Sequence, residues 1–343
     1  MLEHLVDIFW VFAWPIPNVV NAVRLSRLSK ESSKLLETKN GARDRREVVP
    51  FLDLKGHCSV VAGSLRAFFI AYAIVYMGGN YPAFGGASTL SIDWMLPILV
   101  RNLFATWLIC GLWDWFFHFS PFRSILQPHK LNPVYPSQAQ IVHDALYTTG
   151  ATIIASGFEI AYCYSVCSGL LPRVDTTSSL TSWENLLWIA GTAHIRQPHF
   201  YTIHRLMHPW RWDKQGPSFL SRYIPDVGRF LYRHVHSVHH KSHNPTAFSG
   251  TSMHPVEAAL YYSSCLVPIF FNRHPTIVLA WIVDMAVGAW LGHDGFDQPV
   301  GMGDDFHQLH HEHSDCNYGT AIDGIDSLMG TFVASKAHLL KGE

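Results

Sequence analysis

Histidine supplies the most specific chemical pattern in this sequence. The chain has 343 residues and 22 histidines, most of them between His194 and His313. Three short motifs stand out: HRLMH at 204–208, HSVHH at 236–240 and HQLHH at 307–311. Side chains three or four residues apart share one face of a helix, so each motif predicts imidazoles that point the same way. Exposure to solvent does not by itself select imidazole over the side chains of Lys or Glu. The repeated spacing of histidine therefore indicates metal ligation.

Imidazole binds Zn, Cu, Fe and Ni, so the residue type does not identify the metal. The number of ligands is more informative, because a zinc site generally takes four, or three and a water. Eight or more nitrogens suit two metal ions that each keep a free position, which O2 activation requires. The predicted ligands are His204, His208, His236, His239, His240, His307, His310 and His311, with His254 and His293 as an added pair. Glu257, Glu312 and Asp315 are predicted to orient ligating rings.

The composition indicates a membrane protein. Hydrophobic residues make up 48% of the chain and charged residues 15%, against about 25% charged in soluble domains. The net charge is -1 and no basic stripe is present, which argues against nucleic-acid binding. The six cysteines form no CxxC pair, so we expect buried thiols rather than a disulfide framework or a thiolate metal site.

The expected fold is an all-α integral membrane bundle with about four spans and a helical hairpin. Apolar stretches long enough to span lie near 59–79, 95–117, 144–171 and 183–203. The hairpin occupies 256–290, broken at 272–275. Residues 1–57 are predicted to form a retained N-terminal helix and a basic segment, and 58–343 a single membrane domain. Glu159 and Asp284 fall at depth in apolar segments, where we expect each to be hydrogen-bonded between helices.

Charge predicts the orientation. Residues 24–55 are rich in Lys and Arg, whereas 78–94 contain neither, so the first segment is predicted to be cytosolic. Counting crossings from there puts 204–254 and 293–343 on the cytosolic side. Every histidine motif then belongs to one cytosolic, histidine-rich helical cap. The positions of the histidines were not used in counting either the basic residues or the membrane crossings.

The motifs, in order, resemble the fatty acid hydroxylase and sterol desaturase superfamily. The resemblance covers about residues 190–330 and rests on HRLMH, LYRHVHSVHH, NPTAFSGTSMHPVE, GHDGF, and HQLHH followed by NYG. It implies that the motif histidines bind two iron ions at the cytosolic face of the endoplasmic reticulum membrane, with zinc as the metal that purified protein can carry. One departure is Gln197, where many relatives have an acid seven residues before the first motif histidine.

The resemblance also implies an activity: O2-dependent oxidation of a membrane lipid, with electrons from NAD(P)H. The chain has no HPGG-type haem motif, so a separate cytochrome b5 or reductase is the expected donor. Sterol desaturation or hydroxylation is the first choice, because LYRxxHxxHH and HPVE look closer to the sterol branch. Epoxidation of a squalene-like isoprenoid and hydroxylation of a fatty acyl or sphingolipid chain are the alternatives.

Two other classes fit the sequence less well. A zinc membrane hydrolase needs HExxH or a comparable glutamate base beside two ligands, and HEHSD has a different spacing. A non-catalytic metal carrier should have histidines inside the spans, whereas the motifs lie outside them.

Overall fold

The structure is a computed structural model that describes residues 54–127, 130–172, 180–210, 225–296, 304–320 and 324–333. Within these ranges the chain is helical, with one isolated β-bridge between Lys130 and Phe296 and no strand. The all-α prediction is confirmed. The predicted helix and basic segment of residues 1–57 lie almost wholly outside the described residues.

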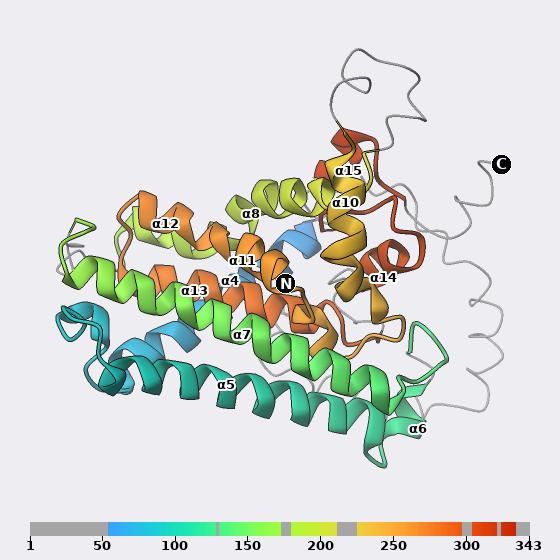
Figure 1. Ribbon diagram of the computed structural model, residues 1–343, viewed down its shortest axis with the longest axis horizontal. Helices are drawn as coiled ribbons and strands as arrows, with labels where there is room; N and C mark the ends of the chain where they lie inside the picture. The colour runs from blue at the N-terminus through green and yellow to red at the C-terminus, as the bar shows by residue number, and fades with distance from the viewer. Residues whose placement is uncertain are drawn as a thin grey trace.

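Five long helices form the body of the molecule (Figure 1): α4 (Leu54–Met77), α5 (Ile92–Asp114), α7 (Gln138–Cys167), α8 (Trp183–Leu206) and α13 (Pro275–Leu291). Ser91, Ser137 and Ser182 begin α5, α7 and α8, and each serine oxygen accepts a backbone N–H of the first turn. The shorter elements are η2 (Pro82–Phe84), η3 (Trp115–Phe119), α6 (Arg123–Leu126), α10 (Val227–His234), η5 (His236–Lys241), η6 (Ala247–Thr251), α11 (Pro255–Tyr262), η7 (Ser263–Cys265), α12 (Leu266–Phe270), α14 (Asp304–His313) and α15 (Ile325–Met329).

Three described helices are long and apolar enough to cross a membrane: His57–Met77, Ile92–Phe119 and Gln138–Cys167. The membrane prediction is therefore confirmed for the first three expected spans. The fourth, 183–203, is a helix of adequate length, but it is not among the apolar candidates. Polar residues explain the difference, because Glu184, Asn185, His194, Arg196 and Gln197 reduce the apolar character of α8.

The predicted hairpin is present. α11, η7 and α12 lead the chain away from the histidine motifs, and α13 returns it. The chain reverses at Asn272, whose φ of 52° places it in the left-handed region that Asn tolerates better than most residues. The side chain of Trp281 on α13 is fully buried, and its indole N–H donates to Ser264 Oγ on the outgoing limb. The two limbs of the hairpin thus pack against each other.

The two acids expected at depth both have partners. Glu159 on α7 accepts from Arg101 Nη2 on α5 at 2.5 Å and from Tyr81 Oη at 3.0 Å. Asp284 on α13 accepts from Arg196 Nε on α8 at 2.9 Å. A buried carboxylate is costly without such partners, so these pairs also fix which helices are neighbours.

The histidine motifs gather at one end of the bundle. α10, α14 and α15 lie at the end where α8 and α13 finish, where α7 begins and where α6 follows α5 (Figure 1). The predicted placement of all the motifs on one face agrees with this arrangement.

Candidate metal centre

Nine of the ten predicted ligands form two compact groups. The first consists of His204, His208, His236, His240 and His310, and the second of His239, His293, His307 and His311. Within each group, one ring nitrogen from every histidine lies within 4.8 Å of all the others. Segments far apart in the sequence therefore supply two separate sets of imidazole donors.

The nitrogens of the first group converge around His236. Its Nε2 lies 3.1 Å from His204 Nε2 and 3.1 Å from His240 Nε2. His310 Nε2 lies 3.2 Å from His240 Nε2. Two imidazole nitrogens bound to one metal at about 2.1 Å are separated by about 3.0 to 3.4 Å, depending on the angle between them. The spacing in this group matches that requirement.

The second group has the same internal spacing. His293 Nε2 lies 3.2 Å from His311 Nε2 and 3.3 Å from His239 Nε2. His311 Nε2 lies 3.2 Å from His307 Nε2. His293 belongs to the segment that follows α13, so the returning limb of the hairpin supplies part of this group.

Adjacent histidines serve different groups. His239 belongs to the second group and His240 to the first, and His310 and His311 are divided in the same way. Consecutive side chains on a helix point about 100° apart, so an HH pair at the end of HxxHH naturally reaches two positions. The prediction that all imidazoles of one motif point the same way is therefore wrong for the HxxHH motifs, because each of them contributes to both groups. HSVHH also forms the 3₁₀ helix η5 rather than an α-helix.

Hydrogen bonds from the far side of each ring orient the donors. His236 Nδ1 lies 2.7 Å from Glu257 Oε1, and His204 Nδ1 lies 2.6 Å from the Tyr318 carbonyl. The Nδ1 atoms of His310 and His293 lie 2.7 and 2.8 Å from the carbonyls of Cys316 and Ala289. A proton on Nδ1 in each ring leaves the Nε2 lone pair facing the group, which is the tautomer that a metal requires.

A buried carboxylate fixes the loop that carries two of these carbonyls. Asp326 is 1% exposed and accepts the backbone N–H groups of Tyr318 at 2.8 Å and Gly319 at 2.7 Å. It also accepts from Thr331 Oγ1 at 2.6 Å. The carbonyls of Cys316 and Tyr318 are thereby held against rings of the first group.

A second buried carboxylate fixes the segment after HSVHH. Asp144 on α7 is fully buried and accepts three serine hydroxyls, from Ser242 at 2.6 Å, Ser249 at 2.8 Å and Ser252 at 3.0 Å. Gly250, in the same segment, packs directly on α13, where a Cβ would lie 2.2 Å from the Ala289 carbonyl oxygen. The segment is thus fixed to both α7 and α13.

Burial keeps the imidazoles neutral. Burial lowers the pKa of His240 to about 3, with a further contribution from neighbouring imidazoles. The pKa values of His310 and His311 are also lowered well below the usual value, first by burial and then by nearby histidines. Rings with such pKa values carry no second proton at neutral pH, so their lone pairs are available to a metal.

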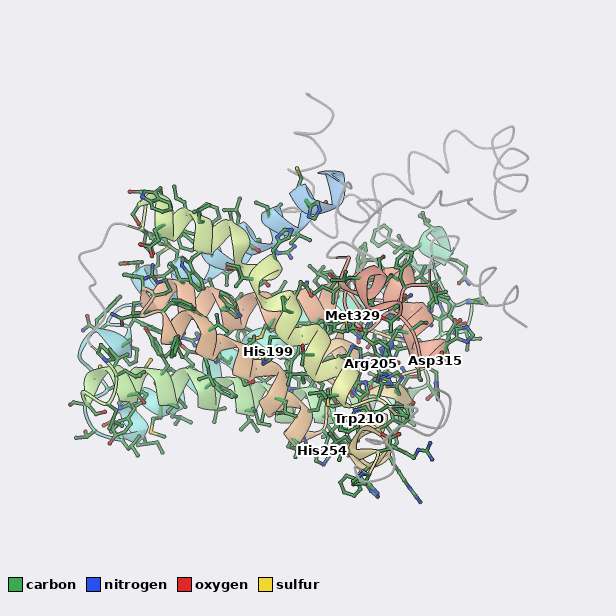
Figure 2. All side chains as sticks on the ribbon, turned by 90° about the horizontal axis from the view of Figure 1, so that it is seen from above. His199, Arg205, Trp210, His254, Asp315 and Met329 are labelled. Carbon is green, nitrogen blue, oxygen red and sulfur yellow. The ribbon has the colours of Figure 1, made fainter. Side chains whose placement is uncertain are left out.

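Three predicted residues lie apart from the groups. His254 begins α11, where its Nδ1 accepts the backbone N–H of Val256 at 3.2 Å, and it belongs to neither group. Figure 2 labels it at one side, away from the nitrogen-rich region near Arg205. Glu312 and Asp315 are exposed at the surface. Of the predicted orienting acids, Glu257 accepts a hydrogen bond from a ring of the first group, His236.

The donor set fits metal ions. His208 is fully buried, and neither of its ring nitrogens has a hydrogen-bond partner. Burying two polar nitrogens in this way is costly unless a ligand satisfies one of them. A metal held by the first group accounts for His208, since its ring lies 4.7 Å from the ring of His236, centroid to centroid.

A cavity that opens to the surface adjoins both groups. Its walls include His204 and His236 from the first group and His239, His293 and His307 from the second. Phe200, Ile203 and Met253 contribute apolar surface. A molecule bound in this cavity would contact histidines of both groups.

Comparison with known proteins agrees with these features. Residues 189–331 match the fatty acid hydroxylase family, a range that contains every histidine of both groups. This region of the chain is similar to the fatty acid hydroxylase family, as the motifs predicted. The motif resemblance is therefore confirmed.

Three relatives illustrate the range of the superfamily. A Dictyostelium discoideum protein named as a methylsterol monooxygenase is 22% identical over 63% of this chain and 76% of its own length. The fatty acid hydroxylase ahd1 of Mycosarcoma maydis is 25% identical over 69% of this chain and 56% of its own length. A Delta(7)-sterol 5(6)-desaturase of Leptosphaeria maculans is 29% identical over 54% of this chain and 48% of its own length. The chain thus spans about half the length of the last two. No solved structure matches it.

Proposed function

We propose that this chain is a membrane-bound, O2-dependent di-iron oxygenase that hydroxylates or desaturates a sterol. The observation that carries the proposal is the pair of imidazole groups in the wall of one cavity. Two iron ions, when bound there, supply the activation of O2 that oxidation of an unactivated C–H bond requires. The names of the relatives support sterol chemistry, since methylsterol monooxygenases recur among them.

The chain's own residues perform three tasks in this proposal. Neutral imidazoles with oriented Nε2 lone pairs hold the metal ions. Glu257 and the carbonyls of Ala289, Cys316 and Tyr318 keep the rings from turning. The apolar wall binds a lipid and excludes water from the carbon nearest the histidines. Hydroxylation replaces one hydrogen of the lipid with a hydroxyl group, whereas desaturation removes two hydrogens from adjacent carbons.

The setting of the reaction is part of the proposal. We assign the histidine end of the bundle to the cytosolic face of the endoplasmic reticulum membrane, on the basis of the basic segment 24–55. The electrons come from NAD(P)H through a separate cytochrome b5 or reductase. A cytosolic position of the histidine end suits such a soluble donor domain.

Hydroxylation of a fatty acyl chain is the second candidate, because a fatty acid hydroxylase is among the relatives. Squalene-type epoxidation has no such support among the relatives named above. A zinc hydrolase is disfavoured because two multi-histidine groups exceed the needs of one closed or open zinc site.

Complementation in yeast tests the proposal. The chain is expressed in strains that each lack one sterol-oxidation or lipid-hydroxylation step, and their sterols and lipids are profiled. We expect one strain to regain its missing product with wild-type protein and with the control variant His254→Ala, but not with His310→Gln. Metal analysis of the detergent-purified chain should find two irons. A single zinc, together with an unchanged lipid profile in every strain, would refute the proposal.

A further inference from the structure

The cavity beside the histidines has a second polar region. α8 lines it with Arg196, Phe200, Ile203, His204 and Met207. These positions recur every three or four residues, so they form one continuous face of the helix. Arg196 precedes His204 by eight residues, a helix path of about 12 Å at 1.5 Å per residue. The cavity therefore extends from the imidazole groups to a cationic side chain deeper in the bundle.

Arg196 is held by an ion pair. Its side chain is 10% exposed, and its Nε donates to Asp284 Oδ2 on α13, whose side chain is 8% exposed. Tyr261 on α11 lines the same part of the cavity, and its hydroxyl donates to the Met285 carbonyl at 2.8 Å. Three helices thus contribute polar groups at one place in a largely apolar wall.

The guanidinium lies close to Gly288 of α13. A Cβ at Gly288 would lie 3.5 Å from Arg196 Nη2, and Gly288 itself lines the cavity. The guanidinium therefore lies against the backbone of α13 while remaining part of the wall. A guanidinium has five N–H donors in a planar fork, which suits it to bind an oxygen acceptor.

We propose that Arg196, positioned by Asp284, binds an oxygen of the substrate's polar group while the carbon to be oxidised lies at the histidine end. The inference rests on the proposed function, because it assumes a lipid substrate in this cavity. A purely hydrocarbon chain end would lie against a buried ion pair and gain no hydrogen bond from it. A sterol hydroxyl or the carboxyl oxygen of a fatty acid supplies the required acceptor.

The separation has a consequence for regiochemistry. About 12 Å of helix path separates Arg196 from the first histidine group. A lipid anchored at Arg196 by its oxygen presents a carbon far from that oxygen to the metal centre.

Direct binding tests the inference without turnover. Tritiated cholesterol is bound to the purified chain and displaced by unlabelled cholesterol, by 3-deoxy cholestene or by stearic acid. We expect wild-type protein to bind at least one oxygen-bearing lipid about tenfold or more tightly than cholestene, the size of one charge-assisted hydrogen bond. Arg196→Met should abolish that preference without changing the affinity for cholestene, and Arg196→Lys should restore part of it.

Metal content is the control for folding, since Arg196→Met should retain the wild-type amount. Preference for cholesterol identifies a hydroxyl ligand, and preference for stearic acid identifies a carboxyl ligand. Equal affinity of wild-type protein for oxygen-bearing and deoxy lipids would overturn the inference. Asp284→Asn, which keeps the shape of the ion pair, should weaken the preference and provides a second variant. If the preference depends on Arg196 but no lipid is oxidised, the proposed function fails and the binding site stands.

Discussion

Replacing Asp326 with Asn perturbs the metal centre without touching a histidine. The carboxylate accepts two backbone N–H groups, from Tyr318 and Gly319, and is 1% exposed. An amide of the same shape has only one acceptor oxygen. If that oxygen faces Tyr318 and Thr331, the amide nitrogen meets the Gly319 N–H, and a backbone amide cannot reverse its role as donor.

The magnitude follows from this one lost bond. A buried donor left unsatisfied costs about 1 to 3 kcal/mol. The loop that it loosens carries the carbonyls that orient His204 and His310, both in the first group. Loss of such an outer partner typically lowers metal affinity about 10- to 100-fold. We therefore expect Asp326→Asn to weaken the first metal position and to leave the second nearly unchanged.

Metal titration of purified protein measures this difference. Two irons per wild-type chain should fall toward one in Asp326→Asn as a competing chelator is increased, with a melting temperature lower by a few degrees. Asp315→Asn is the matched control, because Asp315 is an exposed acid of the same region. Equal retention of both irons by Asp326→Asn and wild type would refute the orienting role of the loop, as would an equal loss from both positions.

Three further outcomes test the assignments. His254→Ala should keep two irons per chain, whereas His293→Ala should lose the metal of the second group. Metal analysis measures both variants, and an equal loss of iron from the two would contradict the grouping. Glu257→Leu should lower iron affinity about 10- to 100-fold and Glu257→Gln much less, because an amide oxygen can still accept from His236; a chelator titration measures both. Asp144→Ala should destabilise the protein by several kcal/mol, since three serine hydroxyls lose their acceptor; an unchanged melting temperature would show that the segment does not depend on it.

The sequence predicted the helices well because their apolar segments are long. Three spans, the hairpin and its reversal near Asn272 follow from hydropathy and helix-breaking residues. α8 was less predictable, because its charged residues face partners that only the tertiary structure reveals. Arg196 pairs with Asp284, 88 residues away, and no local pattern indicates that contact.

The grouping of the histidines was predictable in its members and not in its arrangement. Nine of the ten histidines predicted from residue type and spacing lie in the two groups, and their role as ligands stays a prediction. His254 was predicted as a ligand because it lies at the predicted end of the hairpin, as His293 does at the other end, but it belongs to neither group. The ring-orienting carbonyls of Ala289, Cys316 and Tyr318 had no signal at all, since every residue has a carbonyl.

Because the HH pairs are divided, the same two short elements supply histidines to both groups. η5 contributes His236 and His240 to one group and His239 to the other, and α14 contributes His310 to the first group and His307 and His311 to the second. Displacement of either short element therefore removes donors from both groups. Because neither element is long enough to be stable alone, each must be fixed by tertiary contacts, as Asp144 and Asp326 do for the segments that follow them. Buried carboxylates that lie outside every histidine motif thus help to hold the segments that carry or orient the two histidine groups.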